Sequence, residues 1–123
     1  MCIIQVLTRV YANDADSAVD FYEKLFNKKC AARFHYQEVN LELAQVDNVL
    51  IICGSDESLK PYRETCATFL VDSTAEYKEY LLEHGAAVIS DLKKVPTGFN
   101  MTMKHPDGTI VEYVEFVNGN LCV

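Results

Sequence analysis

The chain has 123 residues, half of them hydrophobic, which is enough for one compact domain with a single substantial core. Its formal net charge of −7 argues against a nucleic-acid-binding protein, because binding to phosphates requires clustered Lys and Arg. No apolar run reaches the length of about 18 residues that a membrane span needs, and no basic secretory signal opens the chain, so we expect no membrane partner.

The first half of the chain predicts one strand, one helix and three further strands. Residues 3–11 alternate and are β-branched, which is typical of a strand. N-cap candidates at 13–16 precede a helix that ends near Asn27 and the lysines at 28–29, and its apolar face is predicted to be Ala18, Phe21, Tyr22, Leu25 and Phe26. Runs at 31–37, 39–46 and 48–54 predict the three strands that follow.

The second half repeats this order after a polar segment that contains Pro61. Residues 66–71 predict a strand, and residues 72–74 supply caps for a helix that ends at Gly85 and whose apolar face is Ala75, Tyr77, Tyr80 and Leu81. Strands are expected near 86–90, 99–104 and 109–117. The pattern predicts a single α+β domain (1–123) of two βαβββ modules, at 3–54 and 65–117, with residues 55–64 as linker.

The last predicted strand carries the most informative polar residue. The turn signal Pro106-Asp107-Gly108 leads into a run in which Glu112 shares a face with Ile110 and Val114. A carboxylate among apolar residues is costly unless something pairs with it. We therefore expect a cavity, a metal ion or a cation in front of Glu112, and Arg9 on the first strand is one candidate cation.

Two segments resemble a known family. The first is Ala18-Val19-Asp20-Phe21-Tyr22 with Leu25-Phe26, and the second runs from His105-Pro106-Asp107-Gly108 to Glu112-Tyr113. Together they resemble the vicinal oxygen chelate superfamily, which includes glyoxalase I, extradiol dioxygenases, fosfomycin-resistance enzymes and bleomycin-resistance proteins. The resemblance covers residues 3–117. It implies that each module curls its mixed sheet into half a barrel, that paired halves enclose a cavity, and that the protein is a homodimer.

The resemblance also implies metal-ligand positions, which fall on Gln5, Ile51, Cys66 and Glu112. Only Glu112 is a usual ligand type, because a Gln amide is a weak donor and Ile is no donor at all. Cys66 and Glu112 could bind a borderline ion such as zinc, but a third strong donor is missing. His35 could point into the cavity and supply it, whereas His84 and His105 are expected to face solvent.

Five cysteines, at 2, 30, 53, 66 and 122, are odd in number and show no C-x-x-C spacing. They predict free, mostly buried thiols in a reducing compartment, and hence a cytoplasmic protein. Cys66 is interpreted as a small buried apolar residue rather than a nucleophile, because the sequence supplies no base beside it.

The segment 93–104 predicts a loop at Pro96 and Gly98 over the cavity mouth, followed by a strand along which Phe99, Met101 and Met103 alternate. Methionine suits an adaptable wall because its side chain is flexible and polarizable. The alternative interpretation is an ordinary turn and a half-buried strand.

Three functions remain open. The sequence favours a cofactor-free and metal-free protein that binds an unknown small molecule, and the predicted ligand-binding residues are Gln5, Arg9, Phe34, Tyr36, Cys66, Phe99, Met101 and Glu112. The alternative is a divalent-metal-dependent lyase, isomerase or dioxygenase, in which Glu112 is the catalytic residue and a metal ligand beside Gln5 and Cys66. A third possibility is an interaction domain whose interior is filled by its own side chains, with Arg9 bridging Glu112.

Overall fold

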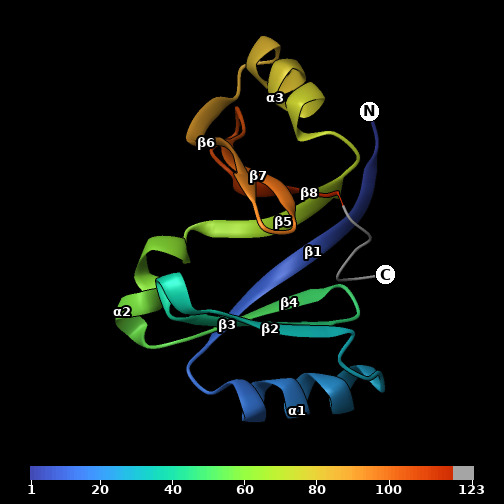
Figure 1. Cartoon of the computed structure of the whole chain (residues 1–123), viewed down its shortest axis with the longest axis vertical. Helices are drawn as coiled ribbons and strands as arrows, with labels where there is room; N and C mark the ends of the chain where they lie inside the picture. Colours follow the sequence, from blue (N-terminus) through green and yellow to red (C-terminus); the bar gives the residue numbers. More distant parts are fainter. Residues whose placement is uncertain (118–123) are drawn as a thin grey trace. The chain divides into compact units, whose positions relative to one another are not determined.

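The computed structural model describes residues 1–117 and divides into two compact units (Figure 1). We call residues 8–64 the first module, and residues 1–7 together with residues 65–117 the second module. Each module is a mixed sheet with one helix packed on one face, so the predicted α+β fold with two βαβββ modules is confirmed. The first seven residues group with the second module, although they begin the strand that opens the first.

The first module contains β1 (Ile3–Ala12, of which residues 8–12 belong here), α1 (Ala15–Phe26), β2 (Ala32–Tyr36), β3 (Leu41–Val46) and β4 (Val49–Cys53). The strand order is β2-β3-β4-β1, antiparallel except for the parallel pair of β1 with β4. A 3-10 turn, η1 (Gln37–Val39), joins β2 to β3. The expected linker is partly helical, since it forms α2 (Asp56–Leu59) and η2 (Lys60–Tyr62).

Helix α1 begins and ends where its caps predict. The Asp14 side chain accepts a hydrogen bond from the Ser17 amide, and Asn27 ends the helix in the left-handed conformation. The side that packs on the sheet is formed by Ala15, Ala18, Val19 and Tyr22. Phe21 and Leu25 are 59% and 62% exposed, so their predicted core positions are wrong. Apolar residues cover more than half of this helix, and the sheet covers only one side of it.

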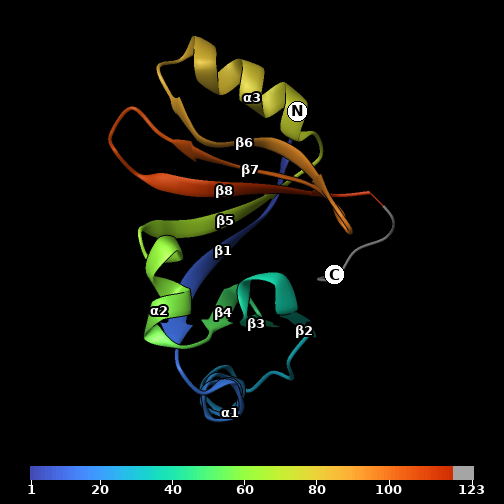
Figure 2. The same cartoon turned by 60° about the vertical axis from the view of Figure 1, so that its left-hand side comes forward.

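The second module contains β5 (Thr65–Val71), α3 (Thr74–Glu83), β6 (Ala87–Val95), β7 (Gly98–Lys104) and β8 (Ile110–Phe116). The strand order is β5-β8-β7-β6, with β5 and β8 parallel, and Figure 2 shows α3 along one face of this sheet. Ser73 caps α3, and the side that faces the sheet is formed by Thr74, Tyr77 and Leu81. Ala75 and Tyr80 are exposed, contrary to prediction, because they lie on the solvent side of the helix.

A tight hairpin joins β6 to β7 at Pro96 and Gly98, where the sequence predicted either a loop over a cavity mouth or an ordinary turn. Strand β6 continues to Val95 and β7 begins at Gly98, so only residues 96–97 connect them. Gly98 has φ 151°, and a Cβ there would lie 1.9 Å from the Glu115 carbonyl oxygen. The close approach of β8 therefore requires glycine at this position.

The cysteines are free where the structure describes them, but they are less buried than predicted. Cys53 is buried, Cys30 is half-buried, and Cys2 and Cys66 are exposed, while Cys122 lies outside the described residues. Cys66 falls where the pairing of β5 with β8 shifts register, and this irregularity gives a physical reason for its exposure. Within residues 1–117, no helix is long and apolar enough to cross a membrane.

Candidate functional site

The face of the second-module sheet that carries Glu112 lies opposite α3. Met101, Met103, Val111 and Tyr113 pack with Tyr77 of the helix in one buried cluster. Because side chains alternate along a strand, Glu112 points to the other side of the sheet, together with Ile110 and Val114. We call this side the α3-distal face.

A row of polar side chains crosses the α3-distal face at Glu112. Thr68 of β5 and Thr102 of β7 are its direct cross-strand neighbours, and Ser90 of β6 lies opposite Thr102. Thr68 is 2% exposed, and its hydroxyl donates to Glu112 Oε1 at 3.0 Å. Glu112 itself is half-buried. The arrangement offers a carboxylate among neutral hydroxyls, which suits a ligand that presents N–H or O–H donors or a positive charge.

Phe99 and Met101 do not share this face with Glu112, so the predicted wall is not formed around the carboxylate. Met101 is 1% exposed in the cluster beneath α3, and Phe99 lies two residues away on the same side of β7. The face toward Glu112 is instead Thr102 together with Asn100, both of which sequence reasoning missed. The alternation of Asn100, Thr102 and Lys104 with the methionines was the available signal.

In the first module, the face opposite α1 carries three of the predicted ligand-binding residues. The register places Arg9, Leu50, Gln45 and Ala32 in one row, and Tyr11, Ile52, Leu43 and Phe34 in the next. Tyr36 follows Phe34 on the same side of β2, and the two rings meet edge to face with centroids 5.1 Å apart. Arg9 Nη1 donates to the Tyr11 hydroxyl at 3.0 Å, and that hydroxyl donates to the Tyr62 carbonyl. We call this surface the α1-distal face.

The positions implied for metal ligands do not form a ligand set. Ile51 is fully buried in the cluster beneath α1, so it lies on the opposite side of its sheet from Arg9. Gln5 is half-buried on β1, and Cys66 is exposed at the irregularity of β5. Nowhere within residues 1–117 do three or more His, Cys, Asp or Glu side chains have an arrangement that could hold a metal ion. This donor set does not fit the metal that the fold family implies.

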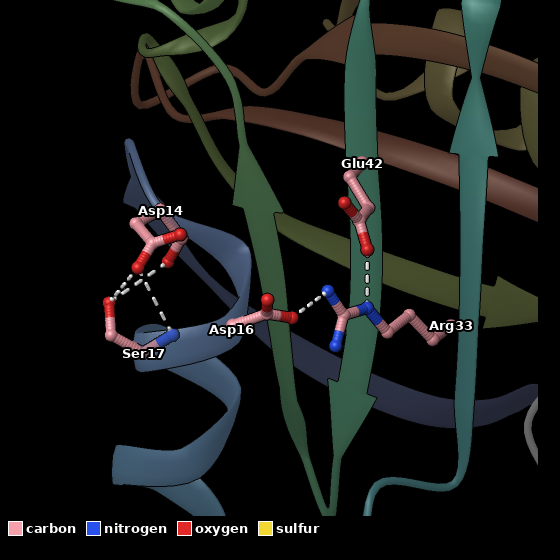
Figure 3. A network of polar contacts seen from close by, with 5 residues as sticks. All are labelled: Asp14, Asp16, Ser17, Arg33 and Glu42. Carbon is pink, nitrogen blue, oxygen red and sulfur yellow. Dashed lines mark hydrogen bonds and ion pairs between the residues drawn. The ribbon is translucent and has the colours of Figure 1, made fainter.

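His35 lies on the α1 side of its sheet, beside Glu42, so it points away from the α1-distal face. It lines a hollow of about 320 Å³ at the start of α1, where Arg33 Nη2 donates to Asp16 Oδ1 at 2.6 Å and Arg33 Nε donates to Glu42 (Figure 3). These two carboxylates raise the pKa of Arg33, first through hydrogen bonding with Glu42. The network ties β2 to α1 and β3.

The remaining histidines differ from one another. His84 is exposed and stacks on Tyr80 with ring centroids 4.0 Å apart, as its predicted solvent position allows. His105 is half-buried, and its Nε2 lies 2.7 Å from the Tyr113 hydroxyl, so its predicted solvent position is wrong. Burial raises the pKa of Tyr113 to about 12. His105 belongs to the packing beside α3.

Comparison with known proteins agrees with this architecture. The model of the Glyoxalase/Bleomycin resistance protein/Dioxygenase superfamily matches residues 4–113. The chain belongs to this superfamily. No curated protein is significantly similar to the chain in sequence.

Several solved structures have a similar fold. An uncharacterised protein from Methanosarcina mazei is 46% identical, with a TM-score of 0.91 and 98% of each chain covered. A methylmalonyl-CoA epimerase is 20% identical, with a TM-score of 0.71, covering 96% of this chain and 97% of that one. The methylmalonyl-CoA epimerase from Mycobacterium tuberculosis is 13% identical, with a TM-score of 0.70 and coverages of 94% and 89%. At these identities the two epimerases share the fold alone.

Proposed function

We propose that the chain is a small-molecule-binding member of its superfamily that works without a bound metal ion. The observation that carries the proposal is the surroundings of Glu112, whose strand neighbours are the hydroxyls of Thr68 and Thr102. Divalent transition metals prefer imidazole, thiolate and carboxylate donors, whereas neutral hydroxyls beside a carboxylate favour an organic donor. The ligand's positive or N–H group binds at Glu112.

The α1-distal face is a separate candidate surface, which lies within the first module. Phe34 and Tyr36 are rigid aromatic side chains, and such rings give a large contact area at a low cost in conformational entropy. Arg9 adds a cation beside them. We therefore propose Arg9, Phe34 and Tyr36 as ligand-binding residues of the first module. In the second module we propose Glu112, with Gln5 and Cys66 as secondary candidates. We also propose that the protein is a homodimer.

A second candidate is favoured by the epimerase likeness and by Glu112 itself. In a metal-dependent lyase or isomerase, an ion polarises a substrate oxygen while a carboxylate moves a proton on the adjacent carbon. The epimerases have a similar fold, and one solved epimerase is a complex with methylmalonyl-CoA and NH4+. Among residues 1–117, no group of three or more His, Cys, Asp or Glu side chains could hold a metal ion, which makes this candidate the weaker one.

Metal titration separates the two candidates. Protein dialysed against a chelator is titrated calorimetrically with Zn²⁺, Ni²⁺ and Mn²⁺, and the expected result is no stoichiometric tight binding. Stoichiometric binding that is lost in Glu112→Ala and weakened in Gln5→Ala would instead establish the metal-dependent candidate. Turnover of α-keto hemithioacetals that depends on the added metal would support the same conclusion.

Ligand binding is then tested by thermal stabilisation with a panel of organic amines and their uncharged isosteres. We expect some amines to raise the melting temperature of the wild type and not of Glu112→Gln, which keeps the shape and removes the charge. Glu83→Gln is the matched control, because it makes the same charge change on an exposed residue of α3. Equal stabilisation of all three proteins would refute a role for Glu112. Sedimentation at micromolar concentration tests the homodimer, and a monomer would refute it.

A further inference from the structure

The α1-distal face contains a buried hydrogen-bond acceptor that no group within residues 1–117 satisfies. Gln45, in the middle of the first-module sheet, is 3% exposed, and its Oε1 has no hydrogen-bond partner in the part of the chain that the structure describes. Its Nε2 donates to the Asp47 carbonyl at 3.0 Å. This donation fixes the orientation of the amide, because turning it over would bring two oxygens together at Asp47.

Unsatisfied buried acceptors are rare in folded proteins, because the acceptor gives up its hydrogen bonds to water and gains none in return. Such an atom calls for a donor from outside the chain, either an ordered water molecule or a ligand. The surroundings of Gln45 favour a ligand. Its row continues through Leu50 to Arg9, and the adjacent row is Phe34, Leu43, Ile52 and Tyr11, so apolar and aromatic side chains lie next to the acceptor.

We propose that Gln45 Oε1 is a specificity-determining acceptor for an aromatic ligand that carries an N–H donor. The aromatic body lies against Phe34 and its neighbours, and the N–H group donates to Gln45. The inference rests on the proposed small-molecule-binding function. It adds Gln45 as a binding residue and an aromatic N–H compound as the class of ligand. Donor and acceptor recognition of this kind discriminates more strongly than apolar contact, because the wrong ligand leaves the acceptor unsatisfied.

The experiment compares indole with benzofuran, which has nearly the same shape but an oxygen in place of the N–H group. Binding to the intact protein is followed by ¹⁵N-edited NMR, up to millimolar concentration, on the Gln45 side-chain amide and on the backbone amides of β2 and β3. We expect indole to bind roughly tenfold more tightly than benzofuran. We also expect only indole to shift the Gln45 side-chain resonance.

Gln45→Met tests the residue itself, because methionine keeps the length and apolar stem of the side chain and removes the acceptor. In this variant, indole and benzofuran should bind with about equal affinity. Gln37→Met is the matched control, because it makes the same change at an exposed residue of η1, and the preference should persist there because Gln45 is intact. If Gln45→Met fails to fold, the side-chain shift in the wild type still decides the question.

Several results would overturn the proposal. These are equal affinity of the two compounds for the wild type, no binding of either, an unchanged preference in Gln45→Met, or an ordered water molecule on Oε1 that remains when indole is added. Amine stabilisation that is lost in Glu112→Gln tests the proposed function separately. A failure at Gln45 with intact amine binding would therefore refute this inference and leave the proposed function standing.

Discussion

Strand β8 carries a second carboxylate, Glu115, whose removal gives a sharp test of how α3 is attached to its sheet. Glu115 Oε1 accepts hydrogen bonds from the Thr74 amide at 2.8 Å and from the Thr74 hydroxyl at 2.9 Å. Thr74 is the first residue of α3 and is 1% exposed. A carboxylate at a helix N-terminus satisfies free amides and interacts favourably with the helix dipole.

The size of the effect follows from these contacts. A hydrogen bond to a charged group contributes about 1.5–3 kcal/mol, and a buried donor left without a partner costs about 1–3 kcal/mol. Because Glu115 is only half-buried, we take the lower part of these ranges and expect Glu115→Ala to reduce the free energy of unfolding by about 2–3 kcal/mol. Glu115→Gln keeps one acceptor oxygen without the charge and should lose roughly half as much.

Urea unfolding followed by circular dichroism measures this loss. For a domain of this size, the midpoint of Glu115→Ala should fall by about 1–2 M. Thr74→Val and the double variant complete a cycle, in which we expect a coupling energy of about 1 kcal/mol. Glu83→Gln, on an exposed residue of the same helix, should change stability by less than about 0.5 kcal/mol. A similarly small loss in Glu115→Ala, or a coupling energy near zero, would refute the reasoning.

Three further predictions concern pH, thiol reactivity and the β6–β7 hairpin. Because burial raises the pKa of Tyr113 from its ordinary value to about 12, the folded state holds this proton longer than the unfolded state, and stability should fall as pH rises from about 10 to 12. Tyr113→Phe should remove that part of the slope in urea titrations at pH 9 to 12, and an unchanged slope would contradict it. Burial also raises the pKa of the Cys53 thiol, so mass-spectrometric mapping should find Cys66 alkylated in the native protein and Cys53 only after unfolding. Gly98→Ala should lower the free energy of unfolding by more than about 2 kcal/mol, because its Cβ would clash with the backbone oxygen of Glu115. A loss below about 1 kcal/mol in urea unfolding would show instead that the hairpin backbone shifts to accommodate the methyl group.

The elements and their ends could be predicted because their signals are local. Asp14 and Asn27 bound α1, and Ser73 begins α3, through contacts within a few residues of each helix end. The repeat of these signals in the same order was sufficient to predict two modules. Propensity and capping decide where an element begins and ends, and both depend on short stretches of sequence.

Which face of an element is covered could not be predicted from the same signals. On β7 the methionines were expected to line a cavity, but they pack beneath α3 and leave Asn100 and Thr102 on the side of Glu112. A strand with one apolar and one polar face fits either orientation until the helix is placed, and a change of one position reverses every side chain. The prediction that Phe21 packs on the sheet was wrong for a similar reason, because the sheet covers only one side of α1.

The candidate site was predicted only at its centre. Glu112 stood out because a carboxylate in an apolar run needs a partner, but its hydrogen-bond donor Thr68 is 44 residues away in the chain. Gln45 gave no signal, because a glutamine in an alternating strand usually faces solvent. Pairings across such distances depend on strand register, which periodicity alone does not determine.

The division of β1 between the modules has a consequence for the order of events during synthesis. The backbone of Cys2 exchanges hydrogen bonds with Asp72, across 70 residues of chain, and residues 1–7 group with the second module. During synthesis, residues 1–7 therefore remain without their native partners until β5 has left the ribosome. This segment includes the apolar side chains of Ile3 and Ile4. Pairing over so long a separation is slow compared with the closure of the hairpins. Until then, residues 1–7 are open to chaperones and to misassembly.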